Sequence, residues 1–204
     1  MFALVESGTI TQFPKGNKGI TIGDNQYPKT IYSLWTEAER NAIGIYTVEI
    51  DSTNRKDEEF YVNTNITYAF GSGKVTGSYG TATAKAIADA DAVDDNGDKV
   101  KDADGNQVIN YGLKTQYKNK FNTEAAGLLS RTDWYVIKAA DVGSYSVPSN
   151  IATYRAAVRT KVNAMETSID GCSDVAALIT LLTYTKDSEG VVSRPLGEFP
   201  DEVV

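Results

Sequence analysis

The sequence contains no histidine among its 204 residues. Histidine is the commonest general base near neutral pH and the commonest transition-metal ligand, so its absence argues against most hydrolytic and zinc-dependent chemistries. In addition, no stretch of the chain places a nucleophile, a base and an oxyanion site together. The sequence therefore predicts a protein that is not an enzyme and that holds neither a cofactor nor a metal ion.

Cysteine is nearly absent as well, since Cys172 is the only one. A single cysteine cannot form an internal disulfide, so the chain is unlike a disulfide-built secreted domain. Cys172 stands just before an expected helix start, where a thiolate would be stabilised. Because no histidine is there to activate it, we favour the alternative that Cys172 is a small buried side chain.

Long apolar segments are also missing, and no run approaches the roughly 20 residues that a membrane-spanning helix requires. The first residues, Met1 to Glu6, lack the basic region of a signal peptide and reach a carboxylate at once. We therefore expect no membrane span. The protein is expected to be made and kept in a cytoplasm, or to leave it by lysis or inside an assembly.

Acidic residues outnumber basic ones, with 27 Asp and Glu against 20 Lys and Arg, which gives a formal net charge of -7. A general attraction to the phosphates of nucleic acids is therefore disfavoured. Proteins, sugars or cations are the expected partners. The chain is also long enough to bury a core without disulfides or metals.

Residues 1–83 predict a small β-rich module. Alternating residues on both sides of Ser7-Gly8 indicate one hairpin, and residues 19–28 indicate a second. Thr36 and Glu39 have the spacing of a capping box and start a short helix that includes Leu34, Trp35 and Ala38 on its apolar side. Strands are expected afterwards at 45–51, 60–62, 66–70 and 74–79, and we predict that they form a β-meander.

The tyrosine-rich stretch from Tyr61 to Tyr79 has two interpretations. Tyrosine offers flat apolar contact with a hydrogen-bonding rim, so this stretch could bind carbohydrate. One solvated polar face is also the usual state of an antiparallel sheet, and we favour that ordinary interpretation.

Residues 84–110 predict an acidic hairpin that links two modules. The alanine-rich segment from Ala82 to Ala92 permits a helix. The turns Asp94–Val100 and Asp102–Val108 carry Asp and Asn at alternate positions, as calcium ligands do. No glutamate closes either turn, and Asn-Gly and Asp-Gly are strong hairpin signals, so we favour an exposed hairpin over a metal site.

Residues 111–183 predict a helical domain. Apolar residues recur at three- to four-residue intervals from Leu113 to Leu129 and, beyond Pro148, from Ile151 to Ile169. Between these two helices, Tyr135 to Lys138 is expected to be extended.

A third, shorter helix is expected from Asp174 to Leu182, with Ser173 as its N-cap. Residues 184–204 carry charge, glycine and proline and are predicted to form an extended C-terminal arm. The sequence thus predicts an α+β protein: a small N-terminal β-rich module, then a C-terminal helical hairpin with a third short helix.

Two short segments of the helical domain carry a family resemblance. They read LLSRTDW, from Leu128 to Trp134, and YRAAVR, from Tyr154 to Arg159. Together they resemble the tail-assembly-chaperone and tail-fibre-assembly proteins of bacteriophages, and the whole layout is similar to uncharacterised tail or virion proteins of marine phages. The resemblance implies a non-enzymatic structural protein of the virion tail, made in the host cytoplasm, whose partners are other tail or fibre proteins.

Two alternatives to a virion component stay open. The protein could be a fibre-assembly chaperone that is not retained in the virion. It could instead be a carbohydrate-binding module that recognises a host surface glycan through the stretch from Tyr61 to Tyr79.

Six residues are candidates for partner contact or for an internal structural brace: Asp133, Trp134, Tyr154, Arg155, Arg159 and Phe121. Trp134 is expected to pack in the angle between the two long helices, and Asp133 to cap or pair. Arg155 and Arg159 lie four residues apart on one helical face. A buried tryptophan is more often core than interface, so we favour the internal brace.

The apolar stripe around Phe121 permits two assemblies. A narrow seam can bury itself in identical copies, and phage fibres are commonly trimeric, so the resemblance implies a homotrimer. In the alternative, Val158, Val162 and Met165 of the return helix cover the stripe, and the chain is a monomer.

Overall fold

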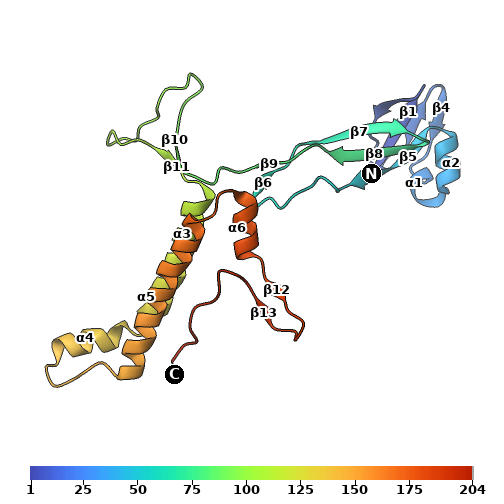
Figure 1. Cartoon of the computed structure of the whole chain (residues 1–204). Helices are drawn as coiled ribbons and strands as arrows, with labels where there is room; N and C mark the ends of the chain where they lie inside the picture. Colours follow the sequence, from blue (N-terminus) through green and yellow to red (C-terminus); the bar gives the residue numbers. More distant parts are fainter. Residues whose placement is uncertain (204) are drawn as a thin grey trace. The chain divides into compact units, whose positions relative to one another are not determined.

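The computed structural model describes residues 1–203 and shows an α+β protein (Figure 1). The chain divides into two compact units, one from Met1 to Thr83 and one from Ala84 onward. The β-rich module predicted from the sequence ends at the same residue, Thr83. Residues 84–110 belong to the second unit.

The first unit is built on a five-stranded sheet with the strand order β2-β1-β5-β8-β7. Its strands are β1 (Phe2–Glu6), β2 (Thr9–Gln12), β5 (Ile45–Asp51), β7 (Ile66–Gly71) and β8 (Lys74–Tyr79). The chain turns between β1 and β2 at Ser7 and Gly8, whose φ angles are 50° and 79°. Two successive positive φ angles are typical of a tight hairpin turn, so the first predicted hairpin is confirmed.

The expected β-meander is wrong in one respect. β7 and β8 form an antiparallel hairpin, but β5 pairs with β8 in parallel, with Val48 opposite Val75. Parallel neighbours need a long connection, and residues 52–73 provide it. β6 (Tyr61–Val62) lies in this connection and is not a strand of the sheet. Alternation predicts that a segment is a strand but carries no information on which strand it pairs with.

Apolar side chains pack on both faces of the sheet, because β1 sends successive residues to opposite sides. One cluster consists of Ala3, Val5, Val48 and Val75. The other consists of Leu4, Ile20, Ile31 and Ile45, with Tyr27, Tyr32 and Trp35 packed against it. The second cluster thus joins the sheet to the segment from Ile20 to Trp35.

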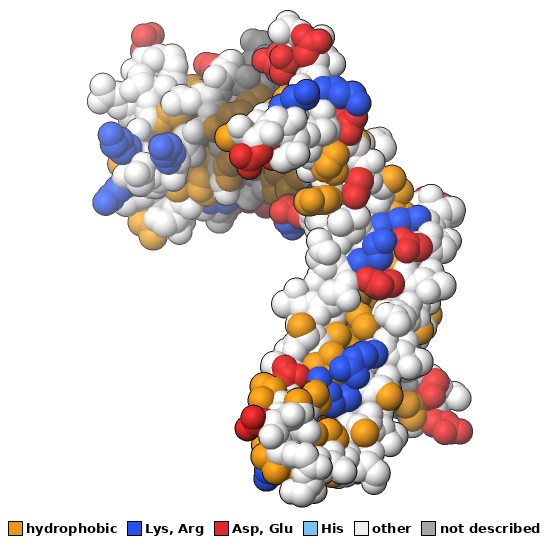
Figure 2. Space-filling view, turned by 90° about the vertical axis from the view of Figure 1, so that its left-hand side faces the viewer, with side chains coloured by type: hydrophobic (Ala, Val, Ile, Leu, Met, Phe, Trp, Pro, Cys, Tyr) orange, Lys and Arg blue, Asp and Glu red, His pale blue; other side chains and the backbone are white. Residues whose placement is uncertain are grey.

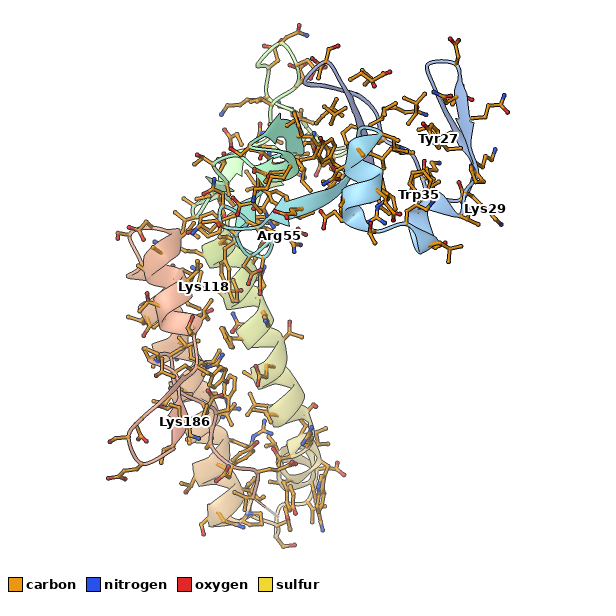
Figure 3. All side chains as sticks on the ribbon, turned by 90° about the vertical axis from the view of Figure 1, so that its right-hand side faces the viewer. Tyr27, Lys29, Trp35, Arg55, Lys118 and Lys186 are labelled. Atoms are coloured by element: carbon orange, nitrogen blue, oxygen red, sulfur yellow. The ribbon has the colours of Figure 1, made fainter. Side chains whose placement is uncertain are left out.

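That segment contains a second hairpin and the first of two short helices. β3 (Ile20–Ile22) pairs with β4 (Asn25–Tyr27), as predicted, and helix α1 (Ile31–Leu34) follows. The ring of Tyr27 lies edge-on to the ring of Trp35, with centroids 5.9 Å apart (Figure 3).

Helix α2 (Glu37–Ala42) begins at the predicted capping box. The backbone N–H of Thr36 donates to Glu39 Oε2 at 2.7 Å, and Glu39 N–H donates to Thr36 Oγ1 at 3.3 Å. Leu34 and Trp35 lie outside this helix, which corrects the expectation that they form its apolar side; Leu34 is 76% exposed. None of the six residues of α2 is buried.

The second unit begins with short strands where the alanine-rich segment permitted a helix. They are β9 (Thr83–Ala84), in which the division between the units falls, and β10 (Ala90–Asp91), which pairs with β11 (Ile109–Asn110). Alanine's helix preference is a weak prior, and this segment has few apolar side chains with which to anchor a helix.

The two aspartate-rich turns lie between β10 and β11 and have the same construction. Asp94 Oδ1 accepts hydrogen bonds from the backbone N–H groups of Asn96 and Asp98, both at 2.9 Å. Asp102 Oδ1 does the same for Asp104 and Asn106. These bonds lower the pKa of the Asp94 and Asp102 carboxyls. The carboxylates therefore hold the turns, as the hairpin interpretation requires.

Helices α3 (Leu113–Ser130) and α5 (Ser149–Asp170) form the predicted helical hairpin and lie side by side (Figure 1). The stripe of α3 is buried at Leu113, Tyr117, Phe121 and Ala125, and that of α5 at Ile151, Tyr154, Val158, Val162, Met165 and Ile169. Lys114 Nζ donates to the Asp170 carbonyl at 2.9 Å, and Lys118 pairs with the Asp170 carboxylate at 2.9 Å. The stripe around Phe121 is therefore covered within one chain.

Helix α4 (Asp133–Asp141) connects α3 to the loop before α5, and it corrects the expectation that Tyr135 to Lys138 are extended. Helix α6 (Val175–Leu182) follows α5. Its N-cap is Asp174, whose Oδ1 accepts from Ala177 N–H at 2.8 Å, and not Ser173 as predicted.

The C-terminal segment is folded onto the helices and is not an extended arm. It contains the hairpin of β12 (Thr185–Lys186) and β13 (Val192–Ser193). Beyond it, Leu196 is only 3% exposed, its N–H donates to the Leu181 carbonyl, and its own carbonyl accepts from Lys161 Nζ at 2.7 Å. One apolar anchor, Leu196, therefore docks a stretch whose composition predicted an extended arm.

Candidate functional site

The segments that carry the family resemblance meet at the corner between α3, α4 and α5. Arg155 of α5 points its guanidinium at this corner and is only 7% exposed. Its Nη1 donates to the Leu129 carbonyl and to Thr132 Oγ1, both at 2.7 Å, and its Nη2 donates to Asp133 Oδ1 at 2.8 Å. We call Arg155 with these three partners the Arg155 brace.

Helix electrostatics explain why an arginine fits at this corner. Leu129 lies in the last turn of α3, where carbonyls lack intrahelical partners and the helix dipole favours a cation. Asp133 lies in the first turn of α4, where the dipole favours an anion. The planar guanidinium binds both helix ends at once, which a lysine could not do with the same geometry.

Thr132 completes the brace, although it was not among the site residues predicted from the sequence. It is 4% exposed, and its hydroxyl donates to the Leu129 carbonyl at 3.0 Å while accepting from Arg155. The two buried polar side chains, Thr132 and Arg155, are hydrogen-bonded to each other and to the Leu129 carbonyl, as buried polar groups must be. The signal was present in the sequence, because Thr132 lies within the LLSRTDW segment.

Trp134 lies outside the brace and is 51% exposed, so the expectation that it packs between the two long helices is wrong. Because α4 continues as a helix from Asp133, the next side chain projects away from the corner that Asp133 faces. The Trp134 ring lies against Tyr135, with centroids 3.9 Å apart, and Lys138 Nζ lies 5.7 Å from its centroid.

Exposed apolar side chains gather around Trp134 on α4 and just beyond it. None of the nine residues of α4 is buried. Ile137 is 66% exposed, Val136 42% and Val142 40%. Hydrophobic side chains are visible at this end of the second unit in Figure 2. We call Trp134, Val136, Ile137 and Val142 the α4 surface.

The remaining predicted site residues lie apart from the α4 surface. Tyr154 is 3% exposed, burial raises the pKa of its phenol, and within residues 1–203 its hydroxyl has no hydrogen-bond partner. Phe121 is 2% exposed and lies under Arg194, whose guanidinium carbon is 5.3 Å from the ring centroid. Arg159 is exposed and is not part of the brace. Two of the six residues, Asp133 and Arg155, therefore form the brace.

The residues that could carry metal or thiol chemistry are not arranged for it. Within residues 1–203, no three His, Cys, Asp or Glu side chains form a group that could hold a metal ion. Cys172 is buried, and burial raises the pKa of its thiol, which keeps it protonated near neutral pH. Also within these residues, no helix combines the length and apolar character needed to cross a membrane.

Comparison with known proteins gives no match: no family model, no curated protein and no solved structure is similar to this chain. The geometry of the corner is therefore the basis for a functional proposal.

Proposed function

We propose that this protein is a non-enzymatic structural component of a bacteriophage tail or tail fibre, and that it contacts a neighbouring tail protein through the α4 surface. The observation that carries the proposal is the different placement of two kinds of side chain at the corner between α3, α4 and α5. The Arg155 guanidinium and the Thr132 hydroxyl are buried in the brace, while Trp134 of the same LLSRTDW segment is left exposed outside it.

The α4 surface has the composition of a protein contact. Tryptophan is among the residues that contribute most to binding energy at interfaces, and exposed apolar groups gathered in one place indicate a binding surface. Trp134 and Ile137 are three residues apart, so they lie on the same side of α4. A partner that covers them gains apolar burial from two large side chains at once.

The brace makes this surface ready for binding. The Arg155 guanidinium fixes the start of α4, and Lys138 Nζ lies over both the Trp134 ring and the Tyr145 ring, 4.3 Å from the latter centroid. Side chains held before binding lose less conformational entropy when a partner arrives. The buried brace therefore holds in place the helix whose exposed side chains would contact the partner.

A photo-crosslinking amino acid at Ile137 tests the proposal, with the same amino acid at Val93 as a matched control. Both residues are exposed, at 66% and 55%, and Val93 stands just before the first aspartate-rich turn, far from α4 in sequence. We expect Ile137 to crosslink to a tail or fibre protein in assembled virions, and Val93 not to do so. Crosslinks that form only in infected cells would favour the chaperone alternative.

If Ile137 captures no tail or fibre protein in either preparation, the proposal is wrong. Trp134→Ser with Ile137→Ser provides a second measurement, because both side chains are exposed and their loss should leave the fold intact. We expect this double variant to fold as the wild type does and to bind the partner more weakly.

A further inference from the structure

The first unit contains a pocket with a volume of about 460 Å³, lined by residues 12–20 and Tyr32. The loop from Pro14 to Gly19 connects β2 to β3 and forms most of its wall. No residue of this pocket belongs to the Arg155 brace or to the α4 surface, so its role is separate from the tail contact proposed above.

Two glycines give the loop its shape. Gly16 has a φ of +73°, and a Cβ added to it would lie 3.5 Å from the ring of Phe2 and 3.6 Å from the ring of Tyr32. At Gly19, an added Cβ would lie 2.5 Å from the Tyr27 carbonyl oxygen, so only glycine permits this close approach. The loop is therefore held against β4 and the aromatic side chains, and the pocket exists before any ligand arrives.

The charge of the pocket differs from that of the whole chain. Its lining includes Lys15 and Lys18 and no carboxylate, in a protein with a formal net charge of -7. Within residues 1–203, neither ammonium group forms an ion pair, and the backbone N–H groups of residues 15–18 donate to no acceptor. The residues that line this open space therefore include two lysines without an ion-pair partner and several backbone N–H groups without an acceptor among residues 1–203.

The rim of the pocket adds an apolar surface and two amides. Phe13 is 42% exposed, and its ring lies 4.7 Å from the ring of Tyr68, which holds it in place. Gln12 and Asn17 contribute side-chain amides to the lining. A flat ring beside amide groups suits a ligand whose body has both apolar faces and hydroxyl groups.

We propose that this pocket binds a small oxyanion-bearing ligand, with its carboxylate or phosphate group between Lys15 and Lys18 and its body against Phe13. The ammonium groups and the free backbone N–H groups supply charge-assisted hydrogen bonds to the oxyanion. Phe13, Gln12 and Asn17 contact the remainder of the ligand. Because the two cations are exposed, binding weakens as ionic strength rises.

Three sugars of nearly equal size test the proposal by two-dimensional amide NMR of the full chain: glucuronate, glucose 6-phosphate and neutral glucose. Each is added at about 10 mM, where a ligand with a millimolar Kd is mostly bound. We expect the amide signals of residues 15–19 to shift with an anionic sugar and not with glucose. Binding of only one of the two anionic sugars identifies carboxylate or phosphate as the preferred group.

The matched variants are Lys15→Gln with Lys18→Gln, and Lys29→Gln. Lys29 is exposed in the same unit, beside Tyr27 in Figure 3, but does not line the pocket. We expect the double variant to weaken binding about tenfold or more, because two charges are removed from the oxyanion site, and Lys29→Gln to leave it unchanged. The proposal is wrong if neither anionic sugar shifts these signals, if glucose shifts them equally, or if Lys29→Gln weakens binding as much as the double variant.

Discussion

Replacing Arg155 with methionine tests the brace directly. Methionine keeps an unbranched apolar stem of similar length in the buried position, so the change removes the guanidinium and little of the packing. The second unit then loses the group that joins the end of α3 to the start of α4. We expect the free energy of unfolding of this unit to fall.

The size of the fall follows from the contacts that are lost. The pair with Asp133 contributes only about 1 kcal/mol, because the Asp133 side chain is 50% exposed and solvent screens it. The bonds to Thr132 Oγ1 and to the Leu129 carbonyl are buried or partly buried, and each contributes about 1 to 1.5 kcal/mol. The expected loss is therefore about 3 to 4 kcal/mol.

Urea denaturation followed by circular dichroism at the helical minimum measures this loss, because the long helices belong to the second unit. Arg159→Met is the matched control: the residue is an exposed arginine one turn later in the same helix. We expect Arg159→Met to change stability by less than about 0.5 kcal/mol. If the two variants lose the same stability, the brace does not hold the corner and the argument from its geometry fails.

Three further predictions concern other parts of the chain. Phe121→Asp should unfold the second unit of a monomeric protein, because its ring is buried within one chain; light scattering that instead shows a wild-type trimer converted to a folded monomer would support the intersubunit seam. Asp174→Ala should cost about 1 kcal/mol in urea denaturation by removing the α6 cap, and an unchanged midpoint would contradict the cap. Hydrogen bonds from Thr36 lower the pKa of Glu39 in the folded state. The charged Glu39 carboxylate therefore stabilises the folded state above the pKa of the unfolded carboxyl, and this stabilisation is lost as the pH falls through the folded pKa. Wild type should therefore be more stable than Glu39→Gln at pH 6 and lose that advantage near pH 3, as followed by Trp35 fluorescence in a Trp134→Phe background.

Local signals in the sequence predicted local structure well. The positive φ angles at Ser7 and Gly8 follow from a Ser-Gly pair between alternating strands, and the capping box follows from the spacing of Thr36 and Glu39. The α3 stripe was predicted from its periodicity, because a helix whose apolar residues recur at this interval has one side to bury.

Features that depend on distant partners were not predictable from these signals. The parallel pairing of β5 with β8 is decided by the path of the chain through residues 52–73. The docking of Leu196 depends on the Leu181 carbonyl and on Lys161, which belong to other elements. In both cases the sequence shows a strand or a polar tail, and only the three-dimensional arrangement supplies the partner.

The sequence identified residues of the candidate site but not how they are arranged. The sequence grouped Asp133, Trp134 and Arg155 and favoured an internal brace built around a buried tryptophan. The structure instead builds the brace from Arg155, Thr132 and Asp133 and leaves Trp134 exposed. The difference arises because Tyr135 to Lys138 are helical, and helix geometry turns Trp134 away from the side that Asp133 occupies.

Quantitative mass spectrometry of purified virions determines whether this protein is a structural component of the tail. We expect this protein to be present in a fixed ratio to the other tail proteins of the phage that encodes it, and we expect Trp134→Ser with Ile137→Ser to lower that ratio while the variant stays folded. A protein that is abundant in infected cells but absent from purified virions would contradict its assignment as a structural component of the tail.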